Sequence, residues 1–303
     1  MKLAAIDIGS NAARLLITEV DESEKGPPQF NKLNLVRVPL RLGFDVFETG
    51  AIPKGKINKV IETIKAYKHL LSIYDVQYLK ACATSAMRDA TNADDIIRKV
   101  KMETGIEIRV ISGDEEASYI YENHIAENLN KEHSYLYIDV GGGSTELTFF
   151  NAGKLVFKES FNIGTIRLLK GHVKEQQWDE LKDFIKLGVK GKSDIIAIGS
   201  GGNINKVFSL SKRKEGKPLP LELLRDYFKE FSSVSLEDRM KLYKLREDRA
   251  DLILPALQIY INVMRWAGIE EIYVPKIGLA DGLVHMLYDE VMSKKFNTST
   301  LVL

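Results

Sequence analysis

The stretch Ile6-Asp7-Ile8-Gly9-Ser10-Asn11 near the start of the chain is matched, 132 residues later, by Ile138-Asp139-Val140-Gly141-Gly142-Gly143. Each copy has apolar residues on both sides of an aspartate and then small residues, a pattern typical of a buried strand that runs into a tight turn. A second apolar run follows each turn, with Leu15-Leu16-Ile17 matching Leu147-Thr148-Phe149. We therefore predict an α/β protein with two similar halves that each open with a β-hairpin.

The rest of the chain alternates helical and strand patterns in both halves. Apolar residues recur with a helical period from Pro53 to Tyr74, and a short strand pattern follows at Val76–Cys82. The predicted boundary follows residue 126, so that residues 1–126 form an N-terminal α/β domain and residues 127–283 a second one. The last helix, at about residues 284–303, is expected to pack back on the first domain.

Composition excludes several classes of protein. The 303 residues include 43 lysines and arginines against 42 aspartates and glutamates, a formal net charge of +1, so a strongly basic DNA-binding protein is not expected. Cys82 is the only cysteine, which excludes an intramolecular disulfide, a cysteine zinc site and an iron–sulfur cluster within one chain. The longest run without a charged residue, Leu252–Met264, has 13 residues, whereas a membrane span needs roughly 20. Since Asp7 stands where a signal peptide would be apolar, we expect a cytoplasmic protein that does not bind membranes.

The second repeat has the composition of a phosphate-binding turn. Asp139 is followed by a run of three glycines and then by Ser144 and Thr145, so several backbone N–H groups can converge on one anion. A glycine-rich hairpin without a ligand has the same appearance. The copy at Ser10 and Asn11 favours the ligand, because two phosphate turns would then face each other across a cleft between the domains.

Acidic residues beside these turns are hard oxygen ligands of the kind that Mg²⁺ prefers. The candidates are Asp7, Asp139 and Glu146. A zinc site is less favoured, because the five histidines are scattered and lack the paired spacing of a zinc hydrolase. The sequence therefore predicts a magnesium site beside the turns.

Arg88 and the pair Glu115 and Glu116 are candidates for the chemistry itself. The planar guanidinium of Arg88 suits a phosphate, although a salt bridge to Asp89 would use the same residue. Glu115 and Glu116 fall in the first turn of a predicted helix, where acids often serve only the helix dipole, but a general base for water must also lie near the anion site. The basic segment Lys206–Lys217 is interpreted as a solvated loop rather than a track for anions.

Four ordered motifs resemble the exopolyphosphatase and guanosine pentaphosphate phosphatase (Ppx/GppA) family. They are Ile6–Asn11, Ala83–Asn92, Ile111–Ala117 and Ile138–Leu147. Glycine turns at Gly199–Gly202 and Gly278–Gly282 extend the resemblance over essentially the whole chain. The resemblance implies a duplicated ribonuclease-H-like fold of the actin-like ATPase superfamily, with two α/β domains around a central cleft.

The resemblance also implies roles for individual residues. It makes Glu116 the catalytic base that activates water and Arg88 a phosphate clamp. It assigns phosphate binding to Ser10, Asn11, Gly141, Gly142, Gly143, Ser144 and Thr145, and the magnesium-associated acids to Asp7, Asp139 and Glu146. Ala12, Ser118 and Asn203 depart from the residues that are usual in the family, which bears on the choice of substrate.

These features together predict a Mg²⁺-dependent hydrolase that releases terminal orthophosphate from inorganic polyphosphate, from guanosine pentaphosphate or from both. The second substrate would connect the protein with the stringent response, and the family resemblance suggests a homodimer. Two alternatives stay open: a non-catalytic sensor that binds guanosine tetra- or pentaphosphate, and an ATP-dependent kinase or ATPase of the same superfamily. The sequence does not distinguish polyphosphate from guanosine pentaphosphate.

Overall fold

The predicted opening hairpin lies at the centre of the first of two sheets. In the computed structural model, β1 (Lys2–Ile8) and β2 (Ala12–Asp21) pair antiparallel. The structure describes residues 1–22, 26–121 and 133–299. The chain divides into two compact units, of which unit 1 comprises Met1–Ser112, Tyr119–Ile125 and Leu279–Leu303, and unit 2 comprises Gly113–Ser118 and Ala126–Gly278.

This division differs in detail from the predicted domains. The segment Gly113–Ser118 groups with unit 2 although it precedes the predicted boundary. The C-terminal part that groups with unit 1 begins at Leu279, whereas the sequence predicts the last helix from about residue 284. The boundary that the sequence predicts after residue 126 lies outside the described residues.

The sheet of unit 1 has the order β3-β2-β1-β4-β5. Its other strands are β3 (Gln29–Pro39), β4 (Tyr78–Ala83) and β5 (Arg109–Val110). The strands β1, β4 and β5 run parallel, and β3 continues the antiparallel hairpin at the edge. A mixed sheet of this kind needs helices on both of its faces.

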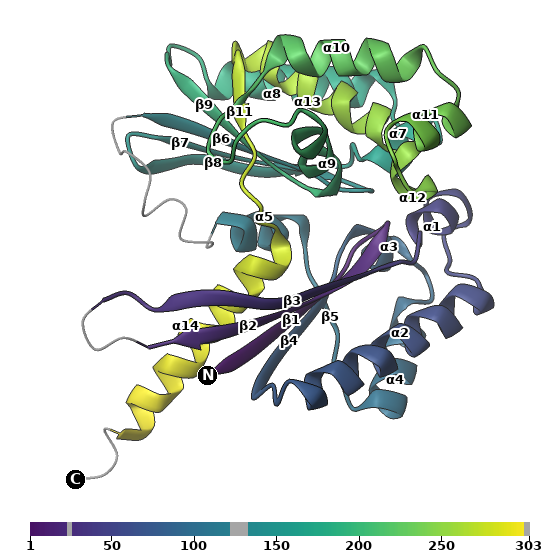
Figure 1. Cartoon of the computed structure of the whole chain (residues 1–303), viewed down its shortest axis with the longest axis vertical. Coiled ribbons are helices and arrows are strands. Elements are labelled where there is room, and N and C mark those ends of the chain that lie inside the picture. The colour runs from purple at the N-terminus through teal and green to yellow at the C-terminus, as the bar shows by residue number, and fades with distance from the viewer. Residues whose placement is uncertain (23–25, 122–132, 300–303) are drawn as a thin grey trace. The chain divides into compact units, whose positions relative to one another are not determined.

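Alternate residues of β1 bury the two faces of this sheet. Ile6 belongs to a core formed with α2 (Lys54–Ile73) and α4 (Ala93–Thr104), whereas Leu3 and Ala5 belong to a second core that includes Leu283. Leu283 lies on α14 (Leu279–Ser299), which packs along β1, β2 and β4. Figure 1 shows this last helix, in yellow, beside the N-terminal strands. The C-terminal helix therefore completes the layer structure of unit 1.

The sheet of unit 2 repeats this plan with one added strand. Its order is β10-β11-β9-β6-β7-β8. The strands are β6 (Ser134–Val140), β7 (Thr145–Asn151), β8 (Lys154–Phe161), β9 (Ile195–Ser200), β10 (Leu219–Pro220) and β11 (Glu271–Tyr273). As in unit 1, the opening hairpin is antiparallel, its first strand is parallel to the next strand of the sheet, and an antiparallel edge strand follows the hairpin. The prediction of two α/β halves with the same opening hairpin is confirmed.

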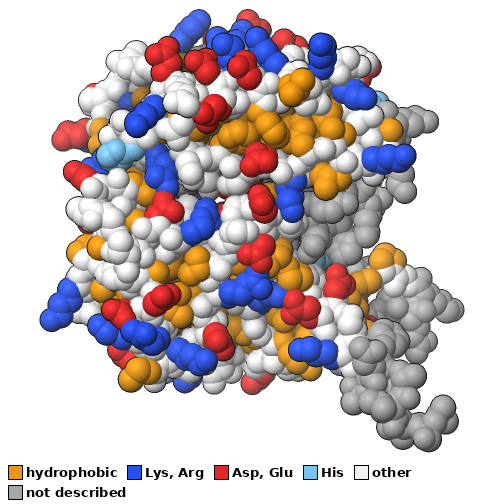
Figure 2. Space-filling view, turned by 180° about the vertical axis from the view of Figure 1, so that it is seen from behind, with side chains coloured by type: hydrophobic (Ala, Val, Ile, Leu, Met, Phe, Trp, Pro, Cys, Tyr) orange, Lys and Arg blue, Asp and Glu red, His pale blue; other side chains and the backbone are white. Residues whose placement is uncertain are grey.

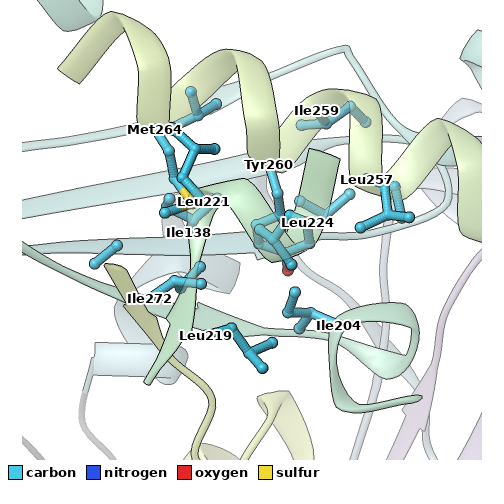
Figure 3. Packing of buried hydrophobic residues seen from close by; sticks show 14 of the residues in the cluster. Ile138, Ile204, Leu219, Leu221, Leu224, Leu257, Ile259, Tyr260, Met264 and Ile272 are labelled. Carbon is cyan, nitrogen blue, oxygen red and sulfur yellow. The ribbon is translucent and has the colours of Figure 1, made fainter. Parts of the chain in front are cut away.

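The core of unit 2 lies between one face of its sheet and a layer of helices. α13 (Ile253–Ala267) is central to this layer, and its side chains meet Ile138 of β6 and Ile272 of β11 (Figure 3). The helices that pack around it are α7 (Thr165–Leu169), α8 (Glu175–Gly188), α9 (Gly202–Leu210), α10 (Leu221–Ser232) and α12 (Glu247–Ala250). α11 (Leu236–Leu242) packs in turn on α12.

α2 agrees with the helix predicted from Pro53 to Tyr74, whereas four short helices were not predicted. α1 (Gly43–Thr49), α3 (Ser85–Asp89), α7 and α12 have four to seven residues each, too few for a helical period to show in the sequence. α5 (Gly113–Tyr121) has the predicted start. Two of these short helices, α3 and α7, lie beside the predicted phosphate turns.

The surface has no strong charge of one sign on the face shown in Figure 2, where basic and acidic side chains are interspersed. This agrees with the formal net charge of +1. No helix within the described part of the chain is long and apolar enough to cross a membrane.

Candidate active site

The turn between β6 and β7 is fixed by hydrogen bonds on both of its sides. The Gly141 N–H donates to the Ser144 carbonyl at 2.9 Å, which closes the turn. Three carbonyls of the turn accept hydrogen bonds from the first turn of α7: that of Gly141 from Thr165 N–H at 3.0 Å, that of Gly142 from Ile166 N–H at 2.8 Å, and that of Gly143 from Arg167 Nε at 2.8 Å. The carbonyls of the turn are therefore directed toward α7.

The opposite side of the same peptide groups presents N–H donors. In a trans peptide the carbonyl of one residue and the N–H of the next point in opposite directions. The N–H groups of Gly142, Gly143 and Ser144 are consequently directed away from α7. Successive backbone N–H groups on one side of a turn are the kind of donor that an anion site uses. We call the segment 141–144 the N–H cradle.

Gly164 explains why the cradle can lie so close to α7. A Cβ atom at this position would lie 2.4 Å from the Gly143 carbonyl carbon and 2.5 Å from the Gly142 carbonyl oxygen. These are backbone atoms, which cannot move aside without distorting the turn. The predicted site residue Thr145 has a related anchoring contact, because its hydroxyl donates to the Ile163 carbonyl at 2.5 Å.

Two carboxylates lie side by side next to the cradle. Asp139 of β6 and Glu146 of β7 are directly opposite each other in the antiparallel register. Such a pair has its Cβ atoms about 5 Å apart and on the same face of the sheet. The neighbouring residues Ile138 and Leu147 point into the core, so the two acids point to the other face.

Each of these carboxylates has a serine donor. The Ser200 hydroxyl donates to Asp139 Oδ1 at 2.6 Å, and the Ser160 hydroxyl donates to Glu146 Oε1 at 2.8 Å. The Ser200 carbonyl in turn accepts a hydrogen bond from the buried Tyr260 hydroxyl. Burial and then the negative charge of Asp139 raise the pKa of Tyr260 well above its ordinary value, so this hydroxyl stays a donor.

Glu116 belongs to the part of α5 that groups with unit 2. Its side chain is only 7% exposed. The helix starts at Gly113, where a Cβ atom would come within 2.5 Å of the Ser160 side chain. Since Ser160 also donates to Glu146, the predicted general base is on a helix whose first residue lies against a hydrogen-bond donor to the carboxylate pair.

The turn between β1 and β2 has the same backbone hydrogen bond but a different surrounding. The Gly9 N–H donates to the Ala12 carbonyl at 3.0 Å. The Asn11 carbonyl accepts from the N–H groups of Leu40 and Arg41, at 3.1 and 2.8 Å. A loop before α1 thus supports this turn, in the way that α7 supports the other.

The side chains around this first turn form polar contacts within unit 1. Asp7 Oδ2 accepts from Arg14 Nη1 at 2.6 Å, an ion pair in which Asp7 is buried. The hydroxyl groups of Ser10 and Ser85 are 2.8 Å apart and both are buried. Arg88 Nη1 donates to the Ile111 carbonyl at 2.7 Å, so one edge of its guanidinium supports the backbone that leads to α5.

The carboxylate pair has the type of donor atom that a divalent cation such as Mg²⁺ prefers. Mg²⁺ binds through one or two carboxylates and keeps water and phosphate oxygens for its other positions. Asp139 and Glu146 place two hard oxygen donors opposite each other, and Asp7 forms an ion pair with the Arg14 guanidinium. Within residues 1–22, 26–121 and 133–299, no three His, Cys, Asp or Glu side chains are grouped so that they could hold a metal by themselves.

The predicted site residues therefore fall into two sets. Unit 2 brings together the cradle, the carboxylate pair and the start of α5, and unit 1 holds Asp7, Ser10, Asn11 and Arg88. The roles given to both sets, and the cleft between the halves, stay predictions. Sequence reasoning missed the supporting residues Gly164, Arg167, Ser160, Ser200 and Tyr260. Of these, only Ser200 had a signal in the sequence, because it lies within the glycine turn Gly199–Gly202.

Comparison with known proteins identifies the family. Residues 20–291 match the model of the Ppx/GppA phosphatase family. The chain is 32% identical over 203 residues to the bifunctional 3-dehydroquinate synthase/phosphatase of Fusobacterium nucleatum, which covers 63% of this chain and 30% of that protein. The chain therefore spans less than a third of the length of that relative.

Other relatives are covered more fully. Exopolyphosphatase 1 of Mycobacterium tuberculosis is 25% identical over 304 residues, 94% of this chain and 87% of that protein. The guanosine-5'-triphosphate,3'-diphosphate pyrophosphatase of Vibrio cholerae is 23% identical over 319 residues, 98% of this chain and 61% of that protein. Both names describe hydrolases of phosphoanhydride bonds.

Solved structures give the same answer for the fold. The Ppx/GppA family member of Aquifex aeolicus superposes with a TM-score of 0.74 at 27% identity, over 97% of this chain and 98% of that one. An exopolyphosphatase of Cytophaga hutchinsonii has the same fold, with a TM-score of 0.82 at 23% identity over 96% and 98% of the two chains. The predicted duplicated fold is thereby confirmed, and the chain belongs to the Ppx/GppA phosphatase family.

Proposed function

We propose that this protein is a Mg²⁺-dependent hydrolase that releases terminal orthophosphate from inorganic polyphosphate, guanosine pentaphosphate or both. The observation that carries the proposal is the N–H cradle next to the carboxylate pair Asp139 and Glu146. Donors for phosphate oxygens and acids for a divalent cation are what hydrolysis of a phosphoanhydride requires. The names of the mycobacterial and Vibrio relatives point to the same two substrates.

In the proposed reaction the cradle binds the terminal phosphoryl group. The N–H groups of Gly142, Gly143 and Ser144 donate to its oxygens and stabilise the charge that develops there. Glu116 accepts a proton from the attacking water, whose oxygen forms a bond to the terminal phosphorus, and its burial in α5 keeps the carboxylate in place. The P–O bond to the rest of the substrate breaks, so that orthophosphate and the shortened polyphosphate or guanosine tetraphosphate are the products. Asp139 and Glu146 would hold Mg²⁺, whose positive charge would offset the negative charge of the substrate.

The proposal is tested by measuring phosphate release from purified protein. Short polyphosphate, long polyphosphate, guanosine pentaphosphate and ATP are compared, each with Mg²⁺ and with excess chelator. We expect release from one or both of the first two substrate classes, loss on chelation, and little release from ATP. A Glu116→Gln variant is expected to lose at least about a thousandfold in turnover while it still binds substrate.

Glu115→Gln is the matched control, because it removes the neighbouring carboxylate of the same helix turn. We expect it to lose less than about tenfold. Normal turnover by Glu116→Gln would show that the base lies elsewhere. No release from any of the four compounds, combined with tight guanosine tetraphosphate binding, would replace the hydrolase by a sensor, and preferential ATP turnover would favour an ATPase or kinase.

A further inference from the structure

The strand β8 contacts the start of α5 at two points, and the first is Gly113. The Cβ that Gly113 lacks would come within 2.5 Å of both Cβ and Oγ of Ser160. The Cβ of Ser160 is fixed by its backbone, so a rotation of the serine would not relieve this contact. The same serine donates to Glu146 Oε1 at 2.8 Å. The first residue of α5 thus lies directly against a residue that supports the carboxylate pair.

The second contact joins Lys158 to Ser118. Lys158 precedes Ser160 by two residues in β8, so both side chains lie on the same face of the sheet. Lys158 Nζ donates to the Ser118 hydroxyl. That hydroxyl donates its own proton to the Asp114 carbonyl at 2.8 Å. A hydroxyl can accept and donate in this way at once.

The two contacts are spaced by similar lengths on both elements. Five residues along a helix, from Gly113 to Ser118, span about 7.5 Å. Two residues along a strand, from Lys158 to Ser160, span about 6.7 Å. α5 therefore lies along β8 in the opposite direction, and Glu116 is on the segment between the two contacts.

We propose that Lys158 is a positioning residue for the general base. Gly113 fixes the beginning of the helix by close packing, and Lys158 fixes the second turn by a charge-assisted hydrogen bond to Ser118. With both ends held, the Glu116 carboxylate keeps its place relative to the cradle. The inference rests on the proposed function, in which Glu116 takes the proton of the attacking water.

The role predicts a particular kinetic signature. A residue that only positions the base affects the chemical step, so its loss lowers kcat and leaves KM nearly unchanged. A lysine that binds the polyanionic substrate would instead raise KM. A lysine that only stabilises the fold would lower the melting temperature and leave the kinetic constants of the folded protein unchanged.

The test measures kcat, KM and the melting temperature of Lys158→Met, Lys158→Arg and Ser118→Ala on the preferred substrate. For Lys158→Met we expect kcat to fall by about tenfold or more, with KM within about twofold. Lys158→Arg keeps a cationic donor and is expected to stay within about threefold of the wild type. Ser118→Ala removes the acceptor, and the double variant Lys158→Met/Ser118→Ala should lose no more than Lys158→Met alone.

Lys154→Met is the matched control, since Lys154 is exposed and lies at the start of the same strand. It should equal the wild type in both kinetic constants. If Lys158→Met fails to fold, Ser118→Ala carries the test alone. An unchanged kcat in Lys158→Met, with or without a raised KM, would overturn the positioning role. The hydrolase proposal would still stand in that case, because the wild type releases phosphate. A wild type that releases no phosphate would overturn the proposed function and this inference together.

Discussion

The two hairpin turns of the molecule share a backbone and differ in charge. In both turns the first glycine N–H donates to the carbonyl three residues later, at 3.0 Å in unit 1 and 2.9 Å in unit 2. The residue opposite the strand aspartate is Arg14 in unit 1 and Glu146 in unit 2. The sequence repeat of 132 residues aligns exactly these two positions.

This difference separates two kinds of site. An aspartate paired with an arginine is already neutralised, whereas two adjacent carboxylates attract a divalent cation. The supports of the turns differ as well, with the loop before α1 in unit 1 and α7 in unit 2. The duplicated backbone therefore does not imply a duplicated function, and the carboxylate pair of unit 2 is the stronger candidate for metal binding.

The largest difference between the two turns is expected for a substitution at Gly164. A Gly164→Ala substitution puts a Cβ 2.4 Å from the backbone of Gly143 and forces the cradle to move. We expect turnover to fall at least about a hundredfold, because a displacement of about 1 Å is enough for such a loss. The free energy of unfolding should fall by about 1–3 kcal/mol, measured by denaturant titration.

The comparison variant in unit 1 is Gly9→Ala, which adds a Cβ within the turn itself. The nearest atom to its added Cβ is the Ala12 carbonyl oxygen at 3.4 Å, which is close to ordinary contact. We expect a loss of less than about tenfold. Gly55→Ala, in a helix and with no atom within 4 Å of the added Cβ, controls for the substitution itself. Equal losses of turnover in Gly164→Ala and Gly9→Ala would show that both positions tolerate an added Cβ equally poorly, which would contradict the prediction from these distances.

The role of Gly164 could not be predicted from the sequence, unlike the hairpins. Alternation of apolar residues within a strand is a local pattern, and the repeat made it visible twice. Gly164 contacts a turn that lies about twenty residues earlier in the chain. The helix after it has only five residues, too few to show a helical periodicity from which its start could be predicted. Ser200 and Tyr260 are likewise brought to Asp139 only by the pairing of strands and the packing of α13.

One part of the site was within reach of the sequence. The repeat that aligns Asp7 with Asp139 also aligns Arg14 with Glu146. The length of a hairpin turn fixes which residues of its two strands face each other. The ion pair of unit 1 and the acid pair of unit 2 could therefore have been predicted from this alignment. The prediction that treats Asp7, Asp139 and Glu146 as equivalent acids did not use it.

The difference in charge between the two turns is tested by neutralising each of the three acids separately. We expect Asp139→Asn and Glu146→Gln each to raise the Mg²⁺ concentration that gives half-maximal turnover by about tenfold or more. Asp7→Asn should raise it by less than about threefold, since Asp7 is held by Arg14. The measurement is a Mg²⁺ titration of phosphate release at saturating substrate.

Melting temperatures of the three variants without Mg²⁺ serve as the control for folding. A Mg²⁺ requirement that rises as much in Asp7→Asn as in the other two would place a metal ligand in unit 1, as the sequence predicts. An unchanged requirement in all three would exclude these acids as ligands.

The smallest expected effect concerns a feature that the two units share. Tyr67 donates to the Ala13 carbonyl at 3.0 Å beside the first turn, and Tyr260 donates to the Ser200 carbonyl beside Asp139. Burial raises the pKa of both hydroxyls above the ordinary value of 10.0. Above pH 10 the unfolded chain therefore loses these protons while the folded chain keeps them, and the free energy of unfolding must fall as the pH rises.

Between pH 9 and 11 each tyrosine should account for about 1 kcal/mol of this fall. Denaturant titrations at the two pH values should show the fall reduced by that amount in Tyr67→Phe and in Tyr260→Phe. A reduction in only one of the two variants would mean that the hydroxyl beside the other turn ionises in the folded protein, and the units would then differ in their hydrogen bonding as well as in their charge.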